Sequence, residues 1–186
     1  MSTEIFLFIG LGNPGKEYKN TRHNVGFMFL DYLIEKMNFQ KFSVEEKFAC
    51  ELSINQYQNS KIILVKPQTF MNNSGETVVR VKNYYKIESV NIFVIHDDLD
   101  IEFPEYKLQY TKGPRQHNGL ISIERHLGTS TFHKVRIGIE NRGELRNIIP
   151  GKDYVLSSFS KEEIKILQNE TFNKIQSNLI SHISLG

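Results

Sequence analysis

The sequence of 186 residues contains a single cysteine, Cys50, and no long apolar run. One cysteine excludes an internal disulfide and is typical of a protein of the reducing cytosol. No stretch approaches the roughly 20 apolar residues that a membrane-spanning helix needs. The first residues also lack the basic flank and apolar core of a signal peptide. We therefore expect a cytoplasmic protein that has no membrane association.

Charge of one sign is also scarce, because the formal net charge is only +2 and the pI is near 8.5. This balance permits a nucleic-acid partner without requiring one, since a local basic face matters more than the total. A hydrophobic content of 39% is too high for a disordered chain. Internal repeats, low-complexity tracts and Pro/Gly/Ser linkers are absent, so we expect residues 1–186 to form a single domain.

The motifs of several common chemistries are missing as well. The chain has no Gly-x-Ser-x-Gly elbow, and Cys50 has no neighbours that would make it a nucleophile, so an acyl-enzyme is not expected. Cys50 is instead predicted to be a small buried residue. Because His-Glu-x-x-His and Cys-x-x-Cys spacings are absent, we expect no metal and no cofactor.

Gly10, Gly12 and Gly15 have the spacing of a dinucleotide-binding fingerprint. That motif requires a helix to begin at the third glycine, so that the amides of its first turn hold a pyrophosphate. Residues 16–22 are polar and lack helical periodicity, and the apolar helical pattern starts only near Val25. The glycines therefore indicate an extended loop that presents Asn13, Tyr18 and His23. A nucleotide-dependent oxidoreductase is a disfavoured alternative.

Short apolar runs alternate with helical patterns along the chain. Strands are predicted at residues 5–9, 62–65, 92–95 and 135–139, with a less apolar strand at 106–110. Helices are predicted from about 25 to 38, behind Ser74 as N-cap, and between 118 and a C-cap at Gly128. A long helix is predicted to follow the Ser160–Glu163 capping box. The predicted fold class is α/β: a three-layer sandwich whose mixed, mostly parallel sheet is flanked by helices.

Polar clusters follow three of the predicted strands: residues 12–13, 66–73 and 96–100. Ligands usually bind at the carboxyl ends of the strands in an open α/β sheet, so one shared site is expected. His23 is the best candidate for a general base, and Asp97 is the carboxylate expected to orient its ring. Either residue alone could merely cap a turn. Asn13, Asn72 and Asn118 would add uncharged donors and acceptors suited to an amide or ester. Together these residues indicate carbonyl hydrolysis by an activated water.

These residues occur in four segments that closely resemble the bacterial-type peptidyl-tRNA hydrolases. The segments are Gly10–Gly15 with Tyr18 and residues 21–24, Lys66–Gly75, His96–Asp100, and His117–Leu120; residues 136–139 and 155–159 fit later parts of the family pattern. The resemblance covers nearly the whole chain in the right order. It implies the peptidyl-tRNA hydrolase fold and hydrolysis of the ester between a peptide and the 3′ ribose of tRNA. Such a reaction would recycle tRNA from peptidyl-tRNAs that drop off ribosomes.

The resemblance also implies roles for individual residues. His23 would activate water, Asp97 would stabilise the histidine, Asn72 would support the oxyanion, and Asn13 and Asn118 would grip the peptide backbone. Tyr18 and Phe70 match positions that contact the tRNA end, although Tyr18 could simply brace its loop and Phe70 could be a core residue. Arg136 matches a phosphate-binding residue, and the alternative is an ordinary solvated charge. The family-based expectation for assembly is a monomer.

The chain departs from the family pattern before His117. Residues 111–116 replace a glycine-rich loop and add Pro114, so a loop that normally moves as a gate could be stiffer here. Gln109 aligns with the lysine that grips phosphate in the family, and Lys107, Lys112 or Arg115 are the candidate replacements. A non-catalytic RNA-binding relative is the main alternative function. Retention of the His–Asp pair argues against it, because binding alone does not need that pair.

Overall fold

In the computed structural model, which describes residues 3–114 and 116–184, seven strands form one sheet in the order β2-β3-β4-β1-β5-β7-β6. The strands are β1 (Ile5–Gly10), β2 (Ser43–Glu45), β3 (Cys50–Tyr57), β4 (Ser60–Pro67), β5 (Ile92–Glu102), β6 (Tyr106–Tyr110) and β7 (His133–Glu140). The neighbours β4, β1, β5 and β7 pair in parallel. β3 is antiparallel to both β2 and β4, and β6 is antiparallel to β7. The sheet is therefore mixed and mostly parallel, as predicted.

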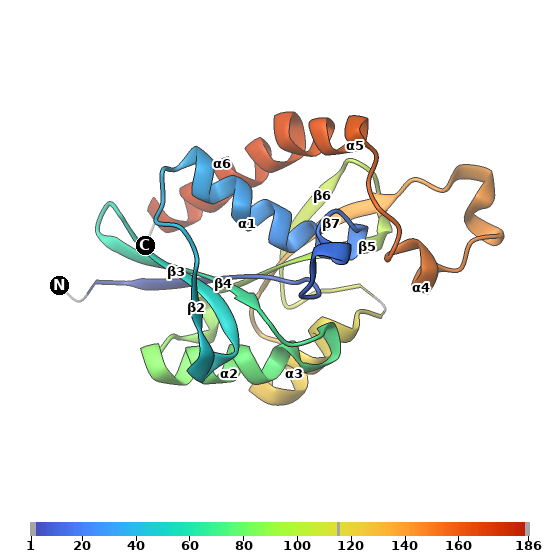
Figure 1. Cartoon of the computed structure of the whole chain (residues 1–186). Helices are drawn as coiled ribbons and strands as arrows, with labels where there is room; N and C mark the ends of the chain where they lie inside the picture. The colour runs from blue at the N-terminus through green and yellow to red at the C-terminus, as the bar shows by residue number, and fades with distance from the viewer. Residues whose placement is uncertain (1–2, 115, 185–186) are drawn as a thin grey trace.

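Helices cover both faces of this sheet (Figure 1). The α-helices are α1 (Val25–Lys36), α2 (Ser74–Tyr85), α3 (Asn118–Leu127), α4 (Gly151–Tyr154), α5 (Lys161–Ile166) and α6 (Phe172–Ser184). Short 3-10 segments are η1 (Lys16–Tyr18), η2 (Arg22–Asn24), η3 (Glu46–Phe48), η4 (Met71–Asn73), η5 (Ser89–Asn91) and η6 (Gly143–Asn147), and η7 (Leu167–Thr171) is π-helical.

Each face of the sheet buries its own apolar cluster. On one face, Phe29 of α1 and Phe172 of α6 pack against the strands, with ring centroids 5.3 Å apart. On the other face, Val78 of α2 and Ile123 of α3 are fully buried against β1, β4 and β5. Burying such side chains contributes about 1.5 to 3 kcal/mol each. This arrangement confirms the predicted three-layer sandwich.

Helix ends agree with the sequence in most places. Gly128 follows α3 in the left-handed conformation with φ 68°, and Ser160 and Glu163 form the predicted capping box. The prediction that Ser74 caps α2 is wrong. Because η4 runs directly into α2, Asn73 occupies the cap position, and the Ser74 hydroxyl lies inside the helix and donates to the Met71 carbonyl oxygen.

The long C-terminal helix is interrupted by the π-helical segment η7 between α5 and α6. Buried side chains recur here every four residues, at Leu167, Thr171, Ile175, Leu179 and Ile183. Four residues exceed the 3.6-residue α-helical turn, so a continuous α-helix would rotate this stripe away from the sheet. A wider π turn keeps the stripe facing the core.

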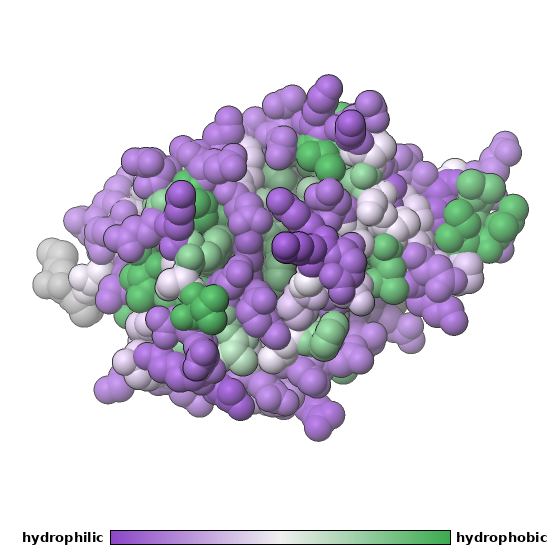
Figure 2. Space-filling model, viewed as in Figure 1, coloured by the Kyte–Doolittle hydropathy of each residue, from purple (hydrophilic) through white to green (hydrophobic). Residues whose placement is uncertain are grey.

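The segment containing η6 and α4 projects beyond the sheet (Figure 1), and apolar side chains gather at its tip (Figure 2). Leu145 is 50% exposed there, and Ile148 is 72% exposed. Within the described residues, none of the helices is both long and apolar enough to cross a membrane.

Candidate active site

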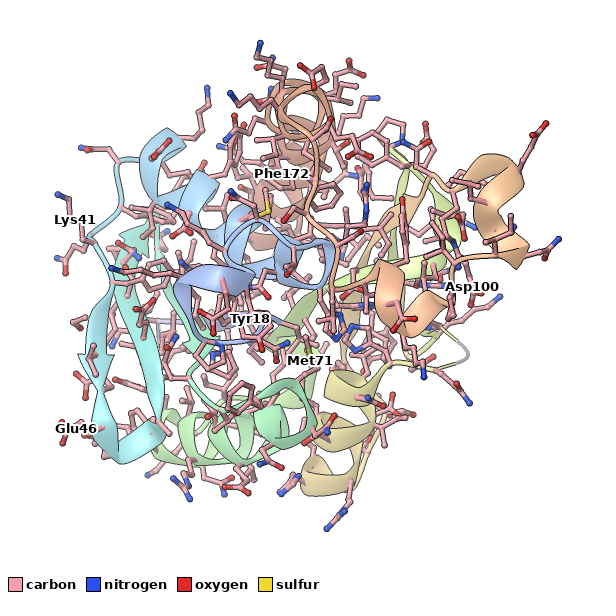
Figure 3. All side chains as sticks on the ribbon, turned by 45° about the vertical axis from the view of Figure 1, so that its right-hand side comes forward. Tyr18, Lys41, Glu46, Met71, Asp100 and Phe172 are labelled. Atoms are coloured by element: carbon pink, nitrogen blue, oxygen red, sulfur yellow. The ribbon has the colours of Figure 1, made fainter. Side chains whose placement is uncertain are left out.

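A cleft of about 960 Å³ opens where β1 and β4 end. Its lining includes Asn13, His23, Phe70, Met71, Asn72, Asp97, Asp98, Leu99, Asp100, Pro114, Gln116, His117, Asn118, Gly151, Lys152, Val155 and Leu156. Met71 and Asp100, labelled in Figure 3, come from η4 and β5 respectively. The predicted convergence of the separate polar segments on one site is therefore confirmed.

The centre of the cleft is a histidine–carboxylate pair. His23 Nδ1 lies 2.7 Å from Asp97 Oδ1, and the histidine side chain is 13% exposed. An ionised carboxylate can only accept hydrogen bonds, so Nδ1 of His23 carries the ring proton and donates a hydrogen bond to Asp97. This tautomer leaves the Nε2 lone pair free to accept a proton from a water molecule in the cleft.

The backbone of His23 is held between the sheet and the segment that follows α4. Its N–H donates to the carbonyl of Val155 at 2.8 Å. The neighbouring Arg22 pairs with Glu163 at 3.0 Å and stacks on the ring of Tyr154. On the other side, Gly26 in the first turn of α1 leaves room for the carbonyl of Ile95, since a Cβ at Gly26 would lie 2.4 Å from that oxygen. These contacts place His23 against β5.

Asp97 differs from the prediction in its local structure. The strand β5 continues to Glu102, so residues 96–100 lie within the sheet and not in a loop after it. Asp97 pairs with Ile137 of β7 in the parallel ladder, and its side chain is 3% exposed. A buried carboxylate is stable only when its charge is compensated by nearby donors. Here both donors to its Oδ1 are imidazoles.

The second imidazole belongs to His117, which the sequence analysis did not select as a site residue. Its Nε2 lies 3.0 Å from the same Asp97 Oδ1, and its Nδ1 accepts from the N–H of Leu120 as the N-cap of α3. Because Nδ1 is an acceptor in this cap, Nε2 carries the ring proton of the neutral imidazole and donates a hydrogen bond to Asp97. The signal that could have identified His117 is its position directly before an amphipathic helix.

His96 lies next to Asp97 on β5 and is fully buried. Its Nδ1 donates to the main-chain carbonyl of Asp97 at 2.7 Å, and its ring meets the ring of His117 edge-on at 4.9 Å. Burial and the neighbouring His117 lower the pKa of His96 to about 3. His96 therefore stays neutral and adds no charge beside the His23–Asp97 pair.

These contacts shift the pKa values of the pair in opposite directions. Burial alone would lower the pKa of His23, but the negative charge and hydrogen bond of Asp97 outweigh it, so the pKa of His23 is raised above 6.5. Burial alone would raise the pKa of Asp97, but the two imidazoles outweigh it and hold that pKa well below 3.8. Asp97 is therefore ionised near neutral pH, and His23 is a stronger base than a free histidine.

The three candidate asparagines reach the cleft from different elements. Asn13 follows β1 and is 9% exposed, and its Oδ1 accepts from the N–H of Met71 at 3.0 Å. The side chain of Asn24 bonds both the N–H and the carbonyl of Asn13, each at 2.9 Å. Because its oxygen is occupied, Asn13 presents the NH₂ donor to the cleft. Asn72 in η4 and Asn118 at the start of α3 are exposed on the cleft wall.

The two predicted aromatic contacts differ in position. Phe70 is 59% exposed and lines the cleft, so it is not a core residue. Tyr18, labelled in Figure 3, ends η1 and is half-buried, and its ring is not part of the cleft lining. Its carbonyl accepts from Thr21 at 2.9 Å, which ties together the loop before His23.

Arg136 of β7 is 6% exposed and is not an ordinary solvated charge. Its Nε donates to Asp98 at 2.7 Å, and its Nη1 donates to Oε1 of Gln109 at 2.6 Å. The prediction that it contacts phosphate stays a prediction. Of the candidate replacements for a lysine at position 109, Lys107 and Lys112 are exposed, and Arg115 lies outside the described residues.

Among the described residues, His23, Asp97 and His117 place possible metal-ligand atoms within 4.8 Å of one another. Metal binding would require lone pairs on both facing nitrogens, whereas the α3 cap and the shared carboxylate oxygen favour an N–H at each. The arrangement is therefore that of a hydrogen-bonded cluster. Burial raises the pKa of Cys50 to about 12, so its thiol is not an activated nucleophile, as predicted.

The fold and the site define a class: an α/β sandwich whose cleft holds a histidine hydrogen-bonded to a buried carboxylate, with carboxamide side chains around them. Residues 7–186 match the family model of peptidyl-tRNA hydrolases. A peptidyl-tRNA hydrolase from Rickettsia bellii (strain RML369-C) is 45% identical over 174 residues, which cover 94% of this chain and 91% of that protein. The corresponding protein of Rickettsia prowazekii (strain Madrid E) is 43% identical over 169 residues, or 91% of this chain and 89% of that protein.

Solved structures agree with these sequence matches. The peptidyl-tRNA hydrolase of Acinetobacter baumannii superimposes with a TM-score of 0.81 at 30% identity, covering 98% of this chain and 95% of that one. The chain belongs to the peptidyl-tRNA hydrolase family. The expectation drawn from its motifs is thereby confirmed.

Proposed function

We propose that this protein hydrolyses the ester that joins the C-terminus of a peptide to the 3′ ribose of tRNA, and so recycles tRNA from peptidyl-tRNAs released by the ribosome. The observation that carries the proposal is the 2.7 Å hydrogen bond between His23 and Asp97, within a cleft lined by Asn13, Asn72 and Asn118. A module that only binds RNA has no use for such a pair, so the non-catalytic alternative is not favoured.

In the proposed reaction, His23 Nε2 takes a proton from water while the water oxygen attacks the ester carbonyl carbon. Asp97 stabilises the imidazolium that forms, and Asn72 donates to the developing oxyanion. The bond to the ribose oxygen then breaks, and this oxygen receives the proton from His23. The products are a free peptide and tRNA, and no cofactor or metal takes part.

The remaining candidate residues bind the substrate. Asn118, with Asn13, grips the peptide backbone, whose N–H and C=O groups are common to every sequence. Phe70 and Tyr18 stack on the 3′ end of the tRNA. Arg136 contributes positive charge for phosphate beside Asp98. The protein acts as a cytoplasmic monomer, and residues 1–186 form one domain.

The test is release of tRNA from N-acetyl-aminoacyl-tRNA, with unblocked aminoacyl-tRNA as the poor substrate. His23→Ala should lower kcat by about 100-fold or more, the usual contribution of a general base. The matched control is His182→Ala, because His182 is an exposed histidine on α6 outside the cleft. Hydrolysis by His23→Ala at the wild-type rate would remove His23 from the proposed role.

A further inference from the structure

Residues 20–23 and residues 155–159 lie side by side in opposite directions, so the backbone of His23 is part of a short ladder. Thr21 and Ser158 form an antiparallel β-bridge in this ladder. Its hydrogen bonds join the N–H groups of Arg22, His23 and Phe159 to the carbonyl oxygens of Ser157, Val155 and Asn20, at 2.8 to 2.9 Å. The position of His23 therefore depends on how firmly residues 155–159 are held.

The side chain of Arg22, the residue before His23, carries a buried charge into this ladder. Arg22 is 7% exposed, and its guanidinium pairs with Glu163 at 3.0 Å. Its Nη1 is buried and has no hydrogen-bond partner among the described residues. The rings of Tyr154 and Phe159 lie against the guanidinium instead, with centroids 4.4 and 4.7 Å from its Cζ. Because a guanidinium removed from water gains most from contact with aromatic faces, the two rings help to compensate this charge.

Tyr154 is itself anchored to the sheet. It ends α4, is 7% exposed and is not one of the described residues that line the cleft. A second guanidinium, that of Arg142, lies 5.2 Å from the centre of its ring. Arg142 forms a bidentate ion pair with Glu140 of β7 and donates to the carbonyl oxygen of Ile149 at 2.7 Å. The ring of Tyr154 thus connects Arg22 to the end of β7.

We propose that Tyr154 is a positioning residue for His23. Its ring holds the Arg22 guanidinium, and Arg22 holds the ladder that sets His23 against Asp97. The inference rests on the proposed function, in which His23 is the general base. Without the ring, the charge of Arg22 loses part of its compensation, so its side chain turns toward water and the adjoining backbone shifts. A displacement of about 1 Å at a reacting group can lower a rate on the order of 100-fold.

The experiment compares two substitutions of Tyr154 in the hydrolysis of N-acetyl-aminoacyl-tRNA. Tyr154→Phe keeps the aromatic ring, whereas Tyr154→Leu replaces it by an apolar side chain without a π face. Tyr32→Leu is the matched control, because Tyr32 of α1 is 4% exposed, belongs to the same apolar cluster and does not line the cleft. Both leucine variants lose a buried ring, so both should be less stable in urea. Assays are run at a temperature where circular dichroism shows every variant to be folded.

The expected effect is on kcat and not on KM, because Tyr154 does not line the cleft. Tyr154→Leu should lower kcat by about tenfold or more. Tyr154→Phe and Tyr32→Leu should keep the wild-type kcat. Equal kcat values for Tyr154→Leu and Tyr32→Leu would overturn the inference, and so would a loss in Tyr154→Phe as large as that in Tyr154→Leu. If the wild type does not hydrolyse this substrate, the proposed function itself fails.

The pKa of His23, measured by NMR titration of its ring, is a second readout that needs no substrate. The titratable groups around the imidazole are Asp97, Asp98 and Asp100 of β5, His117 before α3 and Lys152 of α4. Because the charge of Asp97 raises the pKa of His23, a displaced imidazole should titrate at lower pH. Tyr154→Leu should therefore lower this pKa, and Tyr154→Phe and Tyr32→Leu should leave it unchanged. An unchanged pKa of His23 in folded Tyr154→Leu would overturn the inference, whatever the activity of the wild type.

Discussion

Replacement of Asp97 by asparagine tests the centre of the proposed mechanism. Asparagine keeps the shape of the side chain and an oxygen that can accept from His23 Nδ1, but it removes the charge. A hydrogen bond to a charged group contributes about 1.5 to 3 kcal/mol. In the transition state that bond joins the carboxylate to an imidazolium. Since about 1.4 kcal/mol corresponds to a tenfold change in rate, kcat should fall by about 10- to 150-fold.

The pH dependence gives an independent readout for Asp97→Asn. His23 acts as a base only when it is neutral, so kcat/KM of the wild type should rise with pH through a pKa above 6.5. Without the negative charge, burial is the largest influence left and lowers the pKa of His23, and a hydrogen bond to the neutral asparagine does not offset it, so the acid limb should move to lower pH. The assay is hydrolysis of N-acetyl-aminoacyl-tRNA between pH 5 and 9, with circular dichroism as the control for folding. A rate within threefold of wild type with an unmoved acid limb would refute the reasoning.

Two further predictions concern neighbours of this pair. His117→Ala removes the competing donor to Asp97 Oδ1, so the carboxylate should interact more strongly with His23 and shift the acid limb of kcat/KM to higher pH; a shift in the same direction as that of Asp97→Asn would contradict this. Lys134→Met removes an ammonium whose side chain is 1% exposed and which donates to the carbonyls of Thr111 and Ser130 and pairs with Glu124. Because Glu124 is 37% exposed, the loss of stability should be smaller than that for breaking a fully buried ion pair. We expect the free energy of unfolding in urea to fall by about 2 to 4 kcal/mol. Stability equal to wild type would show that this ammonium does not anchor the loop at Thr111.

The sheet could be predicted where its strands are continuous apolar runs, as in β1 and the first half of β5. The hairpin of β2 and β3 was missed because it contains no continuous apolar run, and only Leu52 and Ile54 alternate with a polar residue, Ser53. Ser53 and Asn55 are buried as well, and both bond the backbone of Gln40. Sequence cannot show that a polar side chain will find such a partner, so the buried polar residues hid this strand.

The same limit applies to the candidate site. His23 and Asp97 could be selected because each stands among residues of distinctive type, and the structure brings them together. His117 and Arg136 depend on tertiary partners instead: the first shares the oxygen of Asp97, and the second is paired with Asp98 and Gln109. Residue type did not reveal that His117, directly before the predicted helix, would contact the central carboxylate.

The position of Asp97 inside a strand explains why these partners are needed. A loop carboxylate would be solvated and free to rotate, whereas Asp97 lies within β5, pairs with Ile137 of β7 and is nearly buried, so it loses its hydration. Burial of an unpaired carboxylate costs several kcal/mol, which one neutral donor does not offset. The α3 cap favours the proton of His117 on Nε2, so this imidazole is a second donor to Asp97, while His23 changes between its neutral and charged forms in the proposed reaction. In the proposed mechanism, the helix cap thus helps to keep the carboxylate ionised and fixed while His23 beside it changes charge.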